Sequence, residues 1–124
     1  MKNYLLVGIA GLIGGIARYW MQGFVSEWTR SDFPYGTLAV NILGCFLIGF
    51  FFALAEERAL ISAEWRIFLT TGFCGGFTTF STFSFETVSM IRQGEILFAG
   101  LYVGMSVLIG FFATYVGSAA GAAI

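Results

Sequence analysis

The sequence contains little charge and no histidine. Only 10% of its 124 residues are Asp, Glu, Lys or Arg, whereas soluble domains have roughly 25%. Hydrophobic residues make up 58% of the chain, and the mean hydropathy is +0.87. A net charge of −1 leaves no basic patch for nucleic acid. The lack of histidine excludes His-based metal sites and catalytic triads. This composition indicates a membrane protein and excludes a soluble domain or a disordered chain.

Cysteine is scarce as well. Cys45 and Cys74 both lie in apolar runs, and they do not form a CxxC pair. We therefore expect no structural disulfide and no zinc site. No nucleophile–base pair or pair of catalytic carboxylates is apparent, so an enzyme is the least expected class of function.

Long stretches with few or no charged residues define the expected architecture. A membrane helix needs about 20 mostly apolar residues. Such stretches predict four spans, at roughly 3–25, 34–55, 66–91 and 96–121. The connectors between them are short and hold most of the charged residues. We therefore expect an all-α membrane protein, with residues 1–124 forming a single four-helix transmembrane domain.

The Lys and Arg residues divide evenly between the two sides of such a bundle. Three belong to each side: Lys2, Arg58 and Arg66 against Arg18, Arg30 and Arg92. Loops rich in Lys and Arg normally stay on the cytoplasmic side. Either these short loops give a weak signal, or the chain inserts in both orientations. The second alternative allows an antiparallel dimer with its two-fold axis in the membrane plane.

Glycine is abundant, with 17 residues, which is about twice the usual share of roughly 7%. Several glycines recur four residues apart, a spacing that lets membrane helices approach closely. These pairs are Gly11/Gly15, Gly72/Gly76, Gly100/Gly104 and Gly117/Gly121. We expect most of them to serve helix packing.

Polar residues interrupt the first two predicted spans. Arg18 falls near the end of the first, where it either anchors at the interface or attracts anions in a vestibule. Thr37 and Asn41 are four residues apart and share one helix face. They either form interhelical hydrogen bonds or offer donors to a passing anion.

The third predicted span contains Gly75-Gly76 followed by a run rich in hydroxyls. Glycine costs about 1 kcal/mol relative to alanine in a helix interior, so this pair favours a break. A break within a membrane must be buried in protein or line a cavity. The break is either a packing kink or a place where freed carbonyls bind a cation and the N-terminus of the following half-helix favours an anion. Phe80 and Phe83 share a face there, and their electropositive ring edges could face an anion.

The last two spans offer further polar groups. Tyr102 and Ser106 share a helix face that Gly110 continues. Their hydroxyls either line an ion path or bond a neighbouring helix. Glu86, near the end of the third span, is either interfacial, a salt-bridge partner or a gate.

Three segments together resemble the Fluc family of bacterial fluoride channels, also called CrcB. They are GGIARY in the first span, FPYGTLAVNILG in the second and GFCGGFTTFSTF in the third. The resemblance extends over nearly the whole chain. It implies an antiparallel, dual-topology homodimer in the bacterial inner membrane, with a broken third helix and two pores. It also implies passive, selective export of cytoplasmic fluoride.

The resemblance assigns roles to residues of this sequence. Backbone carbonyls of Gly75 and Thr78 from both subunits would bind a central structural sodium ion. Arg18 matches the arginine near the vestibule. The residues that match the fluoride path are Asn41, Phe80, Phe83, Thr37, Tyr102 and Ser106. Gly110 departs from the pattern, because a small polar residue is expected there.

Two other classes of protein remain as alternatives. A small dual-topology drug exporter needs a carboxylate deep in the membrane, and the first span has none. A non-transporting membrane scaffold would explain the small-residue packing, but not a broken, hydroxyl-rich third span.

Overall fold

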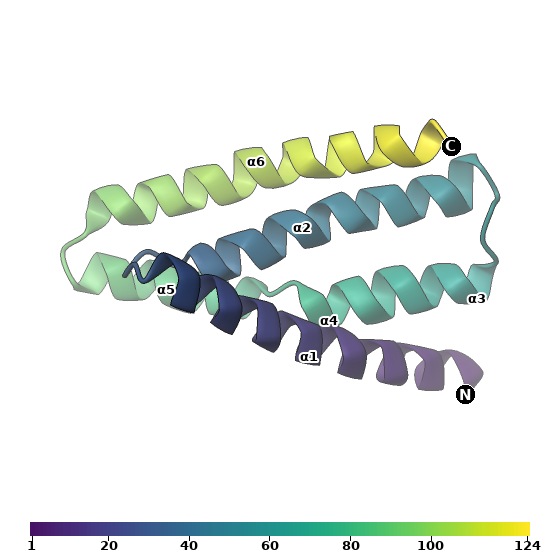
Figure 1. Cartoon of the computed structure of the whole chain (residues 1–124), viewed down its shortest axis with the longest axis horizontal. Coiled ribbons are helices and arrows are strands. Elements are labelled where there is room, and N and C mark those ends of the chain that lie inside the picture. Colours follow the sequence, from purple (N-terminus) through teal and green to yellow (C-terminus); the bar gives the residue numbers. More distant parts are fainter.

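The computed structural model describes residues 1–124 and is entirely helical. Four passes lie side by side along the long axis, with both termini at the same end (Figure 1). The first pass is α1 (Lys2–Thr29), the second is α2 (Tyr35–Phe52) with its extension η1 (Ala53–Glu57), and the fourth is α6 (Ile96–Ala122). The third pass consists of α3 (Ala63–Arg66), η2 (Ile67–Cys74) and α4 (Gly75–Phe77), then α5 (Phe80–Arg92).

The helices agree with the four predicted spans. Three continuous helices are long and apolar enough to cross a membrane: Lys2–Thr29, Tyr35–Glu57 and Ile96–Ala122. The predicted span at 66–91 corresponds to the third pass, which is divided into two parts near its middle. The chain is therefore a multi-pass membrane protein in which one pass is discontinuous.

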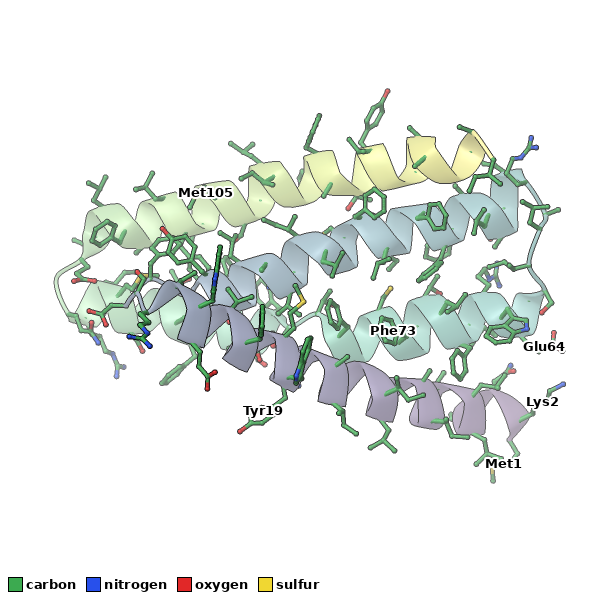
Figure 2. The ribbon with its side chains drawn as sticks, viewed as in Figure 1. Met1, Lys2, Tyr19, Glu64, Phe73 and Met105 are labelled. Carbon is green, nitrogen blue, oxygen red and sulfur yellow. The ribbon has the colours of Figure 1, made fainter.

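Large apolar side chains point outward from the bundle. Tyr19 and Trp28 of α1 are 80% and 82% exposed, and Tyr19 projects away from the other helices (Figure 2). The largest fully buried side chains are those of Tyr102, Val40 and Cys74. A surface this apolar suits lipid or another protein rather than water.

Glycines allow the helix backbones to approach closely. A Cβ on Gly14 would lie 2.3 Å from the Phe73 carbonyl oxygen, and one on Gly117 would lie 2.0 Å from that of Phe46. These glycines therefore hold α1 against η2 and α6 against α2. In contrast, Gly100 and Gly104 meet nothing within 4 Å in this chain. The expectation of packing is thus met within the chain for some glycines and not for this pair.

Candidate ion pathway

The third pass breaks at Thr78 and Thr79. Their backbone angles are extended, at φ −88°, ψ 160° and φ −149°, ψ 119°. Gly75 still has helical angles, so the break begins after the glycine pair rather than at it. Gly76 serves close packing, because a Cβ there would lie 2.6 Å from the Gly11 carbonyl oxygen. The sequence predicted the break correctly, but its place follows from other residues.

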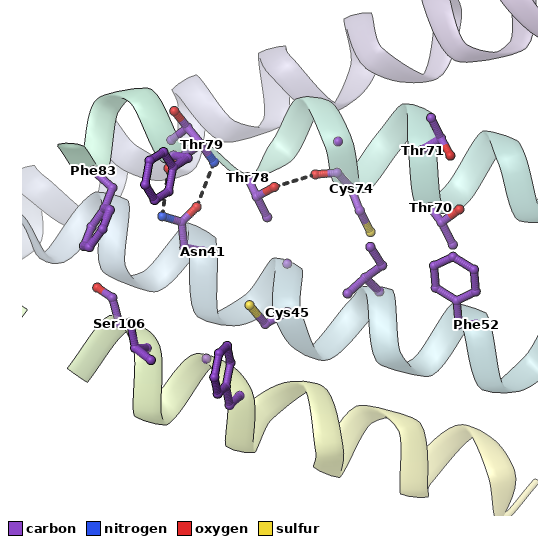
Figure 3. A pocket seen from close by; sticks show the side chains of 17 residues that line it. Asn41, Cys45, Phe52, Thr70, Thr71, Cys74, Thr78, Thr79, Phe83 and Ser106 are labelled. Atoms are coloured by element: carbon purple, nitrogen blue, oxygen red, sulfur yellow. Dashed lines mark hydrogen bonds between the residues drawn. The ribbon is translucent and has the colours of Figure 1, made fainter. Parts of the chain in front are cut away.

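Asn41 of α2 fixes the break from across the bundle. Its Oδ1 accepts a hydrogen bond from the Thr79 amide at 2.8 Å, and its Nδ2 donates to the Thr79 carbonyl at 3.1 Å (Figure 3). The Thr79 hydroxyl then accepts from the Thr82 amide at 3.2 Å and caps the start of α5. A side-chain cap of this kind satisfies an amide that a helix start leaves free.

These bonds release two carbonyls from the helical pattern. In a continuous helix the Thr79 amide would bond to the Gly75 carbonyl, but it bonds to Asn41 instead. The Thr82 amide likewise bonds to the Thr79 hydroxyl rather than to the Thr78 carbonyl. The two oxygens with a predicted role in cation binding are therefore available at the break. Oxygen donors of this type suit hard cations.

A groove of about 650 Å³ runs beside the break, between α2, the third pass and α6. It brings together most of the predicted site residues: Asn41, Gly75, Thr78, Phe80, Phe83 and Ser106. Gly110 lines it as well, and so does Cys45 (Figure 3). None of its 17 lining residues is charged. The groove is thus uncharged and mostly apolar.

The groove presents aromatic rings and a buried hydroxyl without a hydrogen-bond partner. The Phe80 side chain, which lines the groove, is 78% exposed. The centroid of its ring lies 5.7 Å from that of Phe83. The Ser106 hydroxyl oxygen is buried and has no hydrogen-bond partner. A buried polar atom without a partner is unusual. The hydrogen-bonding capacity of the Ser106 hydroxyl is therefore unused within the chain.

Thr37 and Tyr102 lie elsewhere, around Glu86. The Thr37 hydroxyl donates to one Glu86 oxygen at 3.0 Å, and the Tyr102 hydroxyl donates to the other at 2.7 Å. Neither residue lines the groove that holds Ser106. Because a hydroxyl has one hydrogen to donate, both donors are already occupied. These two predicted path residues thus lie outside the groove, although the Tyr102 ring contacts Phe83, which lines it.

Arg18 contacts the first half of the broken pass. Its Nε donates to the Gly76 carbonyl at 3.1 Å, near the end of the first half of the broken pass. A cation is favourable at a helix C-terminus. Gln22, one turn later, donates to the Thr37 hydroxyl at 3.0 Å. We did not predict Gln22 as a site residue. Its only signal in the sequence is an amide inside an apolar span.

Comparison with known proteins identifies the family of this chain. Residues 5–118 match the family described as CrcB-like protein, Camphor Resistance (CrcB). The chain belongs to this family. Its members include a "Fluoride-specific ion channel FluC" from Methylocella silvestris, 44% identical over 98% of this chain and 95% of the relative. A relative with the same name from Chlorobaculum tepidum is 49% identical over 95% of this chain and 93% of its own length. Another from Chlorobium chlorochromatii is 50% identical over 93% of this chain and 88% of its own length. The CrcB family is one of ion channels, so this chain is not an enzyme.

Proposed function

We propose that this chain is a passive, fluoride-selective channel that lets cytoplasmic fluoride leave a bacterial cell down its gradient. The main structural support is the uncharged groove beside the broken pass. It offers aromatic ring edges and hydrogen-bond donors, and no carboxylate lines it to repel an anion. The relatives named fluoride-specific ion channels support the choice of ion.

A second copy of the chain would complete the path. In a single chain the groove lies open along one side, and the Phe80 ring is exposed there. An antiparallel partner would cover the ring and close two equivalent pores. At Gly100 and Gly104 an added Cβ would meet nothing within 4 Å, so these positions would permit close approach of such a partner. The even division of Lys and Arg supports insertion in both orientations.

A sodium ion between the two breaks would suit the freed oxygens. One chain supplies two carbonyls, those of Gly75 and Thr78, and a two-fold partner would supply two more. The chain has no cluster of three or more His, Cys, Asp or Glu residues that could hold a metal ion. Backbone oxygens are therefore the donors on offer. When bound, the ion would hold the four half-helices together.

The groove residues would act on fluoride through hydrogen bonds and ring edges. Fluoride must lose water to enter a narrow path, and polar groups of the wall must replace that water. The Ser106 hydroxyl and the free amide hydrogen of Asn41 provide donors, while the Phe80 and Phe83 edges provide weak positive potential. Chloride is larger and would be excluded by the aromatic lining.

The groove beside the break gives no support to a proton-coupled drug exporter. Such an exporter needs a carboxylate that faces its substrate path, and no acidic residue lines the groove. Glu86 lies outside it and accepts hydrogen bonds from two hydroxyls.

Growth of cells tests the proposal. Expression of the chain should restore growth in inhibitory fluoride to a bacterium that lacks its own fluoride exporter. Phe80→Ala should reduce this rescue, whereas Phe112→Ala, which changes an exposed phenylalanine outside the groove, should not. Failure of the wild-type chain to restore growth, despite normal insertion, would contradict the proposal.

A further inference from the structure

We infer that Phe33, in the connector between α1 and α2, is a positioning residue that holds Phe83 in place through the buried ring of Tyr102. The effect on ion flow rests on the proposed function, whereas the effect on ring position does not. Phe33 does not line the groove. It would therefore act on the path only through its neighbours.

The connector holds the Phe33 backbone tightly. The Phe33 amide donates to the Ser31 hydroxyl at 3.1 Å, and the Phe33 carbonyl accepts from the Tyr35 amide at 2.8 Å. Pro34 between them has φ −79° and ψ 64°, the angles of an inverse γ-turn. This rigid turn packs the Phe33 side chain against a small buried cluster at the end of the bundle: Leu38, Met90, Ala99 and Tyr102.

A chain of aromatic contacts runs from this turn to the groove. The Phe33 ring meets Tyr102 edge-on, with centroids 5.6 Å apart and planes at 81°. Tyr102 in turn meets Phe83 at 5.0 Å, and Phe83 meets Phe80 at 5.7 Å. The Phe33–Tyr102 pair is edge-to-face, which is a favourable arrangement at this distance. The other two pairs are tilted, with their planes at 55° and 52°.

Tyr102 transmits the contact because it has no room to move on its own. It is 0% exposed, and its hydroxyl donates to Glu86 at 2.7 Å. Phe33 and Phe83 both pack against the same ring. Protein interiors are close-packed, so a gap opened at one contact shifts the neighbouring side chains. Loss of the Phe33 ring should therefore displace Tyr102 and then Phe83.

The matched variants are Phe33→Leu and Phe98→Leu. Phe98 of α6 packs on Phe33 at 6.3 Å and is 48% exposed, and it has no ring contact with Tyr102 or Phe83. Fluoride efflux from liposomes should fall about tenfold for Phe33→Leu and less than about twofold for Phe98→Leu. Phe33→Tyr keeps the ring and should restore most of the rate. Phe33→Met replaces Phe33→Leu if that variant does not assemble.

Coupling to Phe83 separates positioning from simple destabilisation. Combining Phe33→Leu with Phe83→Leu should reduce efflux by less than the product of the two single effects, because both act at one place. Combining Phe98→Leu with Phe83→Leu should give the product. Product behaviour for the Phe33 pair would overturn the inference.

Fluorine NMR tests ring position without ion flow. With 4-fluorophenylalanine at position 83, Phe33→Leu should move the resonance and Phe98→Leu should leave it in place. An unmoved resonance in Phe33→Leu would overturn the inference. If the wild-type chain conducts no fluoride, the proposed function fails, and this spectrum still decides whether Phe33 positions Phe83.

Discussion

Single side chains decide where the polar groups of this bundle are free and where they are occupied. Asn41 uses both its oxygen and one of its amide hydrogens on Thr79, which leaves one hydrogen for an ion. Thr37 and Tyr102 both donate to Glu86. Ser106 alone among the predicted hydroxyls is buried and unpartnered. Residues with the same chemistry in the sequence therefore differ in what they can offer a ligand.

Asn41→Asp should reduce fluoride efflux sharply and destabilise the chain. A carboxylate can still accept from the Thr79 amide, but it cannot donate to the Thr79 carbonyl and repels it instead. Loss of such a bond in a buried place costs about 1–3 kcal/mol. Efflux assays and thermal unfolding in detergent measure the two effects, and an unchanged efflux rate would remove Asn41 from the path.

Ser106→Ala should slow fluoride efflux without loss of stability. The hydroxyl has no partner in the protein, so its removal leaves no donor or acceptor unsatisfied and relieves a desolvation cost of about 1 kcal/mol. Thr114→Val is the control, because the Thr114 hydroxyl bonds to the Gly110 carbonyl of its own helix. Equal efflux from Ser106→Ala and the wild type would show that this hydroxyl does not contact the ion.

At the scale of helices, glycine sets the distances and a long-range contact sets the break. Gly75 and Gly76 are helical, and the chain departs from the helix only where Asn41 of another pass captures the Thr79 amide. The glycines on the facing surfaces of α1 and η2 bring these two elements into backbone contact.

Gly14→Ala should therefore destabilise the bundle. Its Cβ would lie 2.3 Å from the Phe73 carbonyl oxygen, a backbone atom that cannot turn away, and overpacking of this kind costs about 1–3 kcal/mol. Gly8→Ala on the same helix meets nothing within 4 Å and should be neutral or slightly stabilising. Thermal unfolding of both variants provides the comparison. Equal loss of stability in the two would show that helix propensity, rather than packing, accounts for the effect.

The sequence predicts the helices well because apolar runs and charged connectors are local features. It also predicts that the third pass breaks, although not that the break begins at Thr78. That position depends on Asn41, 38 residues away. The hydrogen bonds of Thr37 and Tyr102 to Glu86 could not be predicted from the pattern of one helix either, because the three residues belong to three different passes. Arg18 was expected near a vestibule, and its bond to Gly76 depends on how α1 crosses the third pass.

At the scale of the whole molecule, the account requires two copies in opposite orientations. This can be tested by adding positive charge to one side only. Glu57→Lys with Leu60→Lys should hold the second connector in the cytoplasm, and Gln93→Lys with Glu95→Lys should do the same for the third connector. Each double variant alone should fail to protect cells from fluoride, and the two expressed together should succeed. Full protection by either one alone would contradict dual topology.

Fluoride efflux from liposomes distinguishes a fluoride channel from a membrane scaffold. Purified wild-type chain would be reconstituted into vesicles loaded with fluoride, with chloride-loaded vesicles in parallel, and ion-selective electrodes would follow the release. A fluoride-selective channel should release fluoride rapidly and retain chloride. Retention of both ions by vesicles that contain folded, dimeric protein would contradict the channel and favour a membrane scaffold.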